Sequence, residues 1–262
     1  DPYHKLLNMR QLDAEGRSVD LIDPMALPDD AVVAVLSNMG APLVGQERLA
    51  DPEFAVKPLR MMEEHLGRKF DAVMALEIGG GNGLHPMMVA AMTGYPVVDA
   101  DTMGRAYPEA QMTSVAVAGL RCYPLTMADI RDNEIIFPRA ASWRWMERIS
   151  RKACTEIGSV AATCKAPRTG AEVKQHGILY SVSKAIDLGR KVAQARRAHA
   201  DPIEAVLEAG HGKLLFTGKI TDVERRATEG FLRGKAKLEG LGPDAGSDMV
   251  VHFQNEFSVA FR

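Results

Sequence analysis

Three short apolar runs, separated by turn formers and helical patterns, constrain the fold of this chain most strongly. They cover residues 31–37, 71–77 and 95–100 and lack the regular polar alternation of a strand that faces water. Strands that are apolar on both sides are typical of parallel sheets covered by helices on both faces. Residues 53–67, between the first two runs, place apolar side chains at helical spacing. The sequence therefore predicts an α/β layer with parallel strands.

The pattern changes after residue 113. Residues 124–137 predict a β-hairpin with its turn near residues 131–133. Helical periodicity then predicts helices over 142–158, 177–200 and 201–210. From Gly212 onward the apolar residues recur at every second position, which is typical of antiparallel strands with one face in water.

These patterns predict the α/β fold class and a division into two parts. We expect a parallel-strand α/β domain over residues 1–200, in which helices follow the strands, and then a β-rich C-terminal domain whose start is residues 201–262. The chain begins at Asp1 rather than at methionine, and it stops within strand-like alternation. We therefore expect the natural protein to extend in both directions and the β-rich domain to be truncated here.

Charge, hydropathy and cysteine content narrow the classes of partner. The formal net charge is −2, so no broad attraction to nucleic acid or to an anionic membrane is expected. No apolar run approaches the ~20 residues of a membrane span, and the start shows no signal-peptide pattern. The 3 cysteines have no metal-ligand spacing and suit a reducing compartment. We expect a cytoplasmic protein with a small-molecule substrate and with neither nucleic acid nor membrane as a partner.

A glycine-rich stretch, EIGGGNGLHP, covers residues 77–86 after the second apolar run. Ligands of open α/β sheets bind beyond the carboxyl ends of the strands, where glycines let the backbone come close to them. Leu84 stands where G-x-G-x-x-G needs its third glycine, and no P-loop Gly-Lys-Ser/Thr follows, so we expect no nucleotide. The stretch is either a tight turn that requires positive φ or a ligand-binding loop formed by Gly79, Gly80, Gly81 and Asn82.

Carboxylates crowd the end of the third apolar run. Asp99 and Asp101 are two residues apart, so in a strand both side chains point the same way. Arg105 and Glu109 follow at a spacing that would pair them within a helix. Glu77 ends the neighbouring run. Such crowding is tolerated when carboxylates pair with arginine, share protons or hold a metal. The alternatives are a polar active-site rim and a salt network centred on Arg105.

Other polar residues also allow two interpretations. His211 lies at a predicted helix-to-strand junction, where it either caps the helix or binds a ligand. Asn255 and Glu256 interrupt an apolar strand run and either reach a site or mark an ordinary strand edge. No histidine is near the cysteines in sequence, so we interpret them as small core residues rather than nucleophiles: Cys122, Cys154 and Cys164.

The segment from Glu77 to Met112, EIGGGNGLHPMMVAAMTGYPVVDADTMGRAYPEAQM, resembles the signature of the S-methyl-thiohydantoin desulfurase-like family. Two further stretches fit the same family, residues 212–240 and the FQNE of residues 253–256. The resemblance covers most of the chain, and its most specific part is PVVDAD-MGRA-PE. Genes of the family often lie beside hydantoinase and oxoprolinase genes.

The resemblance implies a hydrolase that acts on a small cyclic ureide or thioureide. The reaction after which the family is named converts an S-methyl-thiohydantoin to a hydantoin and releases methanethiol. The alternative is a non-catalytic ligand-binding or accessory partner of a hydantoinase or oxoprolinase. A homo-oligomer is a further candidate assembly.

Specific roles follow as expectations. The expected catalytic residues are Asp99, Asp101, Arg105 and Glu109, with a carboxylate as general base and Arg105 holding a substrate carboxylate. The expected substrate-binding residues are Glu77, Gly79, Gly80, Gly81, Asn82 and His211. A divalent metal is a candidate cofactor, with candidate ligands Asp99, Asp101 and His85. Many members of the family that this chain resembles carry an apolar residue in place of His85.

Overall fold

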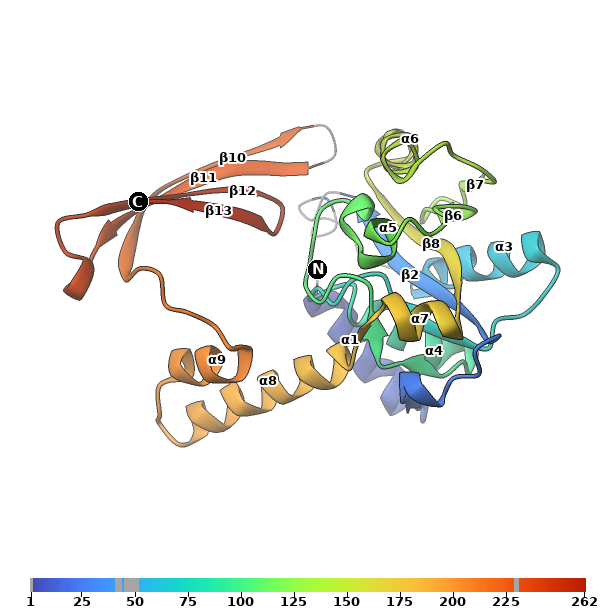
Figure 1. The fold of residues 1–262 in the computed structure, drawn as a ribbon, viewed down its shortest axis with the longest axis horizontal. Helices are drawn as coiled ribbons and strands as arrows, with labels where there is room; N and C mark the ends of the chain where they lie inside the picture. Colours follow the sequence, from blue (N-terminus) through green and yellow to red (C-terminus); the bar gives the residue numbers. More distant parts are fainter. Residues whose placement is uncertain (1, 41–43, 45–51, 229–230) are drawn as a thin grey trace.

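The computed structural model describes residues 2–40, 44, 52–228 and 231–262. Within these ranges the N-terminal part is an α/β body built on a seven-stranded sheet, and a four-stranded antiparallel sheet lies beside this body (Figure 1). The predicted fold class is therefore confirmed, with parallel strands in the N-terminal part, helices after them and a β-rich C-terminal part.

The large sheet has the strand order β1-β4-β3-β2-β8-β6-β7 in the described part of the chain. The first four of these strands run parallel, whereas β8 is antiparallel to β2 and β6, and β6 is antiparallel to β7. Their bounds are β1 (Leu21–Ile22), β2 (Val32–Gly40), β3 (Ala72–Ala75), β4 (Val97–Val98), β6 (Leu125–Ala128), β7 (Glu134–Phe137) and β8 (Val160–Thr169). A short antiparallel pair adds β5 (Ala100–Asp101) and β9 (Ile178–Leu179).

The core lies on both faces of this sheet. In β2, Ala34 and Leu36 pack into the core on one face, while Val33 and Val35 pack into the core on the other. This alternation has the two-residue period of a strand. Because both faces are covered, the sequence of β2 reads as a continuous apolar run.

Helices cover the two faces. The first face is packed by α1 (Pro2–Ala14), η2 (Pro52–Ala55), α3 (Lys57–Leu66) and α4 (His85–Thr93). The second face is packed by the segment that follows η1 (Pro24–Ala26), by η3 (Ala110–Met112) and by α7 (Gly170–His176). Helix α6 (Trp143–Glu156) packs on β6 and β8. The short α5 (Ser114–Val117) follows η3.

The C-terminal sheet has the order β10-β11-β12-β13 and is joined to the body through α8 (Ser181–Arg197) and α9 (Pro202–Gly210) (Figure 1). Its elements are β10 (Gly218–Thr228), β11 (Phe231–Gly240), η4 (Gly242–Asp244), β12 (Asp248–Gln254) and β13 (Phe257–Phe261). Most of its described side chains are exposed, but Phe231, at one end of the sheet, is only 6 % exposed. That end is turned toward the side of the body that carries α6 (Figure 1).

Several sequence expectations are sharpened or corrected. The hairpin is confirmed as β6 and β7. Strand β8 was not predicted, although it pairs with both β2 and β6. The predicted helix over 177–200 begins only at Ser181, after β9. The domain boundary predicted after residue 200 falls between α8 and α9 and stays a prediction. None of the described helices is long and apolar enough to cross a bilayer.

Candidate active site

A small polar cavity lies at the carboxyl ends of β2 and β3. Its volume is about 40 Å³. Its walls come from the end of β2, the glycine-rich loop, residues 103–110, α6 and β8. The lining residues that carry the argument below are Asn38, Glu77, Asn82, Glu109, Glu147, Arg151 and Lys165. This is the edge of an open α/β sheet at which ligands bind.

Glu77 is the most unusual group in this cavity. Its side chain is buried, and its Oε1 accepts a hydrogen bond of 2.5 Å from Asn82 Nδ2. Its Oε2 has no hydrogen-bond partner among the described residues. Burial raises the pKa of Glu77 to about 7; the Asn82 hydrogen bond opposes the shift and the charge of Glu256 adds to it. A carboxyl group with this pKa can both accept and return a proton near neutral pH.

The glycine-rich loop brings its backbone against this carboxylate. A Cβ on Gly79 would overlap Glu77 Oε2, whereas a Cβ on Gly81 would meet nothing within 4 Å. Asn82 joins the loop to the end of β2, because its Oδ1 accepts from Asn38 N at 2.8 Å. Neither Gly79 nor Gly81 has positive φ. The glycine at position 79 is therefore required for close approach rather than for a left-handed turn.

Cations and a second carboxylate also line the cavity. Arg151 Nε donates to Glu147 Oε1 at 2.5 Å, and its guanidinium also donates to Pro108 O at 2.9 Å. Lys165 of β8 is buried, and burial lowers its pKa to about 8, against the opposing effect of the Glu147 charge. Enzymes that use a glutamate or a lysine in acid–base catalysis tune the glutamate pKa up and the lysine pKa down toward neutral pH by burial.

The two aspartates predicted as a catalytic pair make separate contacts. Asp99 accepts from Val182 N and Ser183 N at the start of α8, and from Ser183 Oγ. Asp101 Oδ2 accepts from the backbone N–H groups of Ile78, Met103 and Gly104. Asp99 therefore caps α8, while Asp101 fixes the start of the glycine-rich loop beside Glu77. These contacts favour structural and positioning roles.

The other predicted residues are spread over a wider region. Glu109 lines the cavity and accepts from Gln111 Nε2 at 2.9 Å. Arg105 is exposed, with its guanidinium 5.0 Å from the Tyr107 ring centre, and no ion pair joins it to Glu109 in the described ranges. His211 is exposed at the C-terminal end of α9, away from the other predicted residues.

The three candidate metal ligands lie in separate surroundings. Asp99 and the Oδ2 atom of Asp101 are engaged as described above, whereas Asp101 Oδ1 is buried without a hydrogen-bond partner among the described residues. His85 is fully buried at the start of α4, and neither ring nitrogen has a hydrogen-bond partner among the described residues. No group of three or more His, Cys, Asp or Glu side chains is arranged to hold a metal in the described part of the chain.

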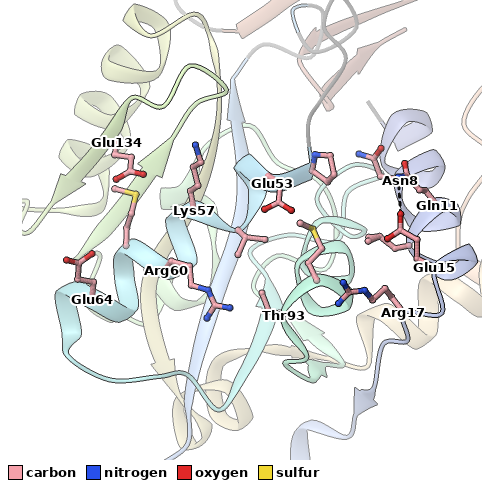
Figure 2. Close-up of a pocket in the computed structure, with 15 residues that line it drawn as sticks. Asn8, Gln11, Glu15, Arg17, Glu53, Lys57, Arg60, Glu64, Thr93 and Glu134 are labelled. Atoms are coloured by element: carbon pink, nitrogen blue, oxygen red, sulfur yellow. Dashed lines mark hydrogen bonds between the residues drawn. The ribbon is translucent and has the colours of Figure 1, made fainter.

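A larger cavity, of about 580 Å³, lies between α1, η2, α3 and α4 (Figure 2). Figure 2 shows charged side chains of both signs on its walls, Arg17, Arg60 and Glu53 among them. None of the sequence-predicted site residues lines it. We place the candidate site at the smaller cavity because buried polar atoms without a described partner, Glu77 Oε2 and Asn38 Oδ1, belong to residues that line it.

Sequence patterns missed three residues of this site. Lys165 lies in the unpredicted strand β8, and Glu147 and Arg151 lie in α6, which was predicted as a helix without a site residue. In the structure Glu147 and Arg151 are buried, whereas Ile149 is 44 % exposed. The available signal was a lysine within a run of small apolar residues, VAATCKA, because a buried lysine requires a reason.

Comparisons with known proteins show the family of the chain and a related fold. The model of the S-Me-THD-like N-terminal domain matches residues 1–139, and that of the S-Me-THD-like C-terminal domain matches residues 141–262. The fold is similar to the crystal structure of a protein from Chromobacterium violaceum, with a TM-score of 0.70 and 24% sequence identity. The alignment covers 92% of this chain and 65% of that chain, so this chain spans less than two thirds of that protein. No curated protein matches the chain.

Proposed function

Because the chain belongs to the S-Me-THD-like family, we propose that it hydrolyses a small cyclic ureide or thioureide, with an S-methyl-thiohydantoin as the model substrate. The observation that carries the proposal is Glu77, a buried carboxyl group with one oxygen free of described partners and a pKa raised to about 7. Lys165 in the same cavity supplies the complementary acid, since its lowered pKa of about 8 keeps it protonated at neutral pH.

The proposed reaction needs only water and these two groups. Glu77 removes a proton from water as the water oxygen bonds to the ring carbon that carries sulfur, and the C=N electron pair moves to nitrogen, which takes a proton from Lys165. Collapse of the tetrahedral centre breaks the C–S bond. The thiolate leaves with the proton held by Glu77, and the hydroxyl proton returns to Lys165. The products are a hydantoin and methanethiol.

Substrate binding requires the cavity to widen. A volume of about 40 Å³ holds only about three waters. The loop over residues 103–110 is one wall, and it is held to α6 through the contacts of Arg151 and Glu147 with Pro108 and Ala110. Arg105 at the exposed part of this loop is the proposed contact for a substrate carboxylate, and the N–H groups of Gly80 and Gly81 are proposed to face the ring oxygen.

An assay of thiol release tests the proposal. The purified protein is incubated with S-methyl-thiohydantoins and, in parallel, with plain hydantoins, across pH 5 to 10. We expect release of methanethiol with a bell-shaped pH profile whose limbs lie near the pKa values of Glu77 and Lys165, about 7 and about 8. If the ring binds without turnover and a hydantoinase copurifies, the hydrolase proposal is rejected in favour of an accessory role.

A pair of glycine variants tests the position of Glu77. Gly79→Ala forces the Glu77 carboxylate to move because the new methyl group overlaps its Oε2, whereas Gly81→Ala adds a methyl group in open space. We expect kcat/KM to fall about 10- to 100-fold in the first variant and to stay within about twofold in the second. Equal activities in the two variants would show that the carboxylate does not need its observed position.

A further inference from the structure

One end of the C-terminal sheet lies close to the candidate site. Phe231 is buried although most of the sheet is exposed. The guanidinium of Arg151 lies 4.2 Å from the centre of the Phe231 ring, a cation–π contact between α6 and β11. The same guanidinium is bonded to Glu147 and Pro108. Arg151 therefore joins the cavity wall to the end of the sheet.

The neighbouring turn between β12 and β13 is held in one conformation. Asn255 has φ 50°. Its backbone N–H donates to Leu232 O at 2.7 Å, and its Oδ1 accepts from Leu232 N at 2.8 Å. This pair of bonds fixes the turn to the start of β11, next to Phe231. The next residue, Glu256, is thereby placed by backbone hydrogen bonds rather than by a free loop.

Glu256 faces charges that belong to the candidate site. It is half-buried, and burial raises the pKa of its carboxyl group against the opposing charges of Arg151 and Arg105. It also interacts unfavourably with the charge of Glu77. A carboxylate from the C-terminal sheet thus lies close enough to interact with both arginines and with the proposed base.

We propose that Glu256 is the charge-selecting residue of the site, a resident carboxylate that occupies the arginine-lined region where a carboxylate on the substrate would bind. This inference rests on the proposed function for its substrate ring. It adds a substrate class, rings with an anionic side chain, which compete with Glu256 for Arg105 and Arg151. Phe231 and Asn255 are positioning residues for this exchange.

Two effects follow from replacing Glu256 by glutamine. The amide no longer competes for the arginines, so an anionic ring binds more tightly, while a neutral ring of the same shape is unaffected. The second effect concerns the proton on Glu77. Its charged surroundings are Lys5 of α1, Asp101 of β5 and Glu256, with Glu109, Glu147, Arg151 and Lys165 across the cavity. Loss of one negative charge lowers the pKa of Glu77 and moves the acid limb of activity to lower pH.

The experiment compares Glu256→Gln with a matched control, Glu239→Gln, an exposed carboxylate at the other end of β11. Calorimetry measures binding of hydantoin-5-acetate and of 5-methylhydantoin to each protein, and thiol release is followed against pH. We expect Glu256→Gln to tighten the Kd of hydantoin-5-acetate about tenfold and to leave that of 5-methylhydantoin unchanged. The control variant should match the natural protein with both ligands.

The outcomes separate this proposal from the hydrolase itself. An unchanged or weaker affinity of Glu256→Gln for hydantoin-5-acetate overturns it, as does a failure of both rings to bind. Selective tightening without thiol release from any protein would support the charge-selecting role and reject the hydrolase. A shift of the acid limb in Glu256→Gln but not in Glu239→Gln adds support that simple packing of the turn would not produce.

Discussion

Replacing Glu77 by glutamine is expected to lower kcat about 10²- to 10⁴-fold, the usual range for loss of a general base. Glutamine keeps the size of the side chain and can still hydrogen-bond to Asn82, but it cannot take a proton from water. Single-turnover thiol release at pH 7.5 measures the effect. A variant that keeps more than a tenth of the activity would remove Glu77 from the base role.

Measurements of stability test whether Glu77→Gln loses activity through the missing proton acceptor or through unfolding. The pKa of Glu77 is about 7 in the fold against a usual 4.5, so the folded state binds more protons than the unfolded chain between these values. The stability of the natural protein therefore falls as pH rises from 4.5 to 7, and the cost persists at higher pH. Glu77→Gln should be more stable at pH 8 by as much as about 3 kcal/mol. Glu64→Gln, which alters an exposed carboxylate on α3, should change neither activity nor stability.

The layered part of the fold could be predicted because its signals are local. Each buried strand carries its apolar residues in one run, and each run ends at turn formers, so β2, β3 and β4 need no distant information. Strand β8 lacks such a signal. It contains Lys165, Pro167 and Arg168 among small residues, and only pairing with β2 and β6 buries it. Tertiary pairing here overrides local propensity.

The sequence indicated the glycine-rich loop as part of the candidate site, whereas the contacts of its carboxylates depend on distant segments. The glycine-rich loop and Glu77 lie together at the carboxyl end of β3, as the motif indicated. The hydrogen-bond partners of Asp99 and Asp101 could not be predicted, because they come from other segments. The start of α8 donates to Asp99, and the backbone of the glycine-rich loop donates to Asp101. A two-residue spacing indicates direction, but it does not indicate which segment returns to occupy that side. The position of Glu256 near the site could not be predicted for the same reason, because it depends on where the C-terminal sheet lies.

Lys5 offers the second large effect, on stability. Its side chain in α1 is 7 % exposed, and Nζ has no hydrogen-bond partner among the described residues. Burial lowers the pKa of Lys5 to about 7, and the charge of Glu77 opposes the shift. Between pH 7 and the usual 10.5 the unfolded chain binds more protons than the fold, so this group destabilises most at pH 7 and below. Lys5→Met should raise the free energy of unfolding by about 4 kcal/mol at pH 6, and by about 2 kcal/mol at pH 9.

Denaturant unfolding at these two pH values measures the effect, with Lys152→Met, an exposed lysine of α6, as the matched control that should change little. At pH 6 the Glu77 carboxyl is largely neutral, so the comparison isolates the cost of burying the ammonium group. At and below pH 7, where Lys5 carries its proton, the variant also removes a positive charge that favours ionised Glu77, and the acid limb of thiol release should therefore move to higher pH. A Lys5→Met protein less stable than the natural one at pH 6 would mean that the amine is held by favourable contacts, and the electrostatic account of this side of Glu77 would be wrong.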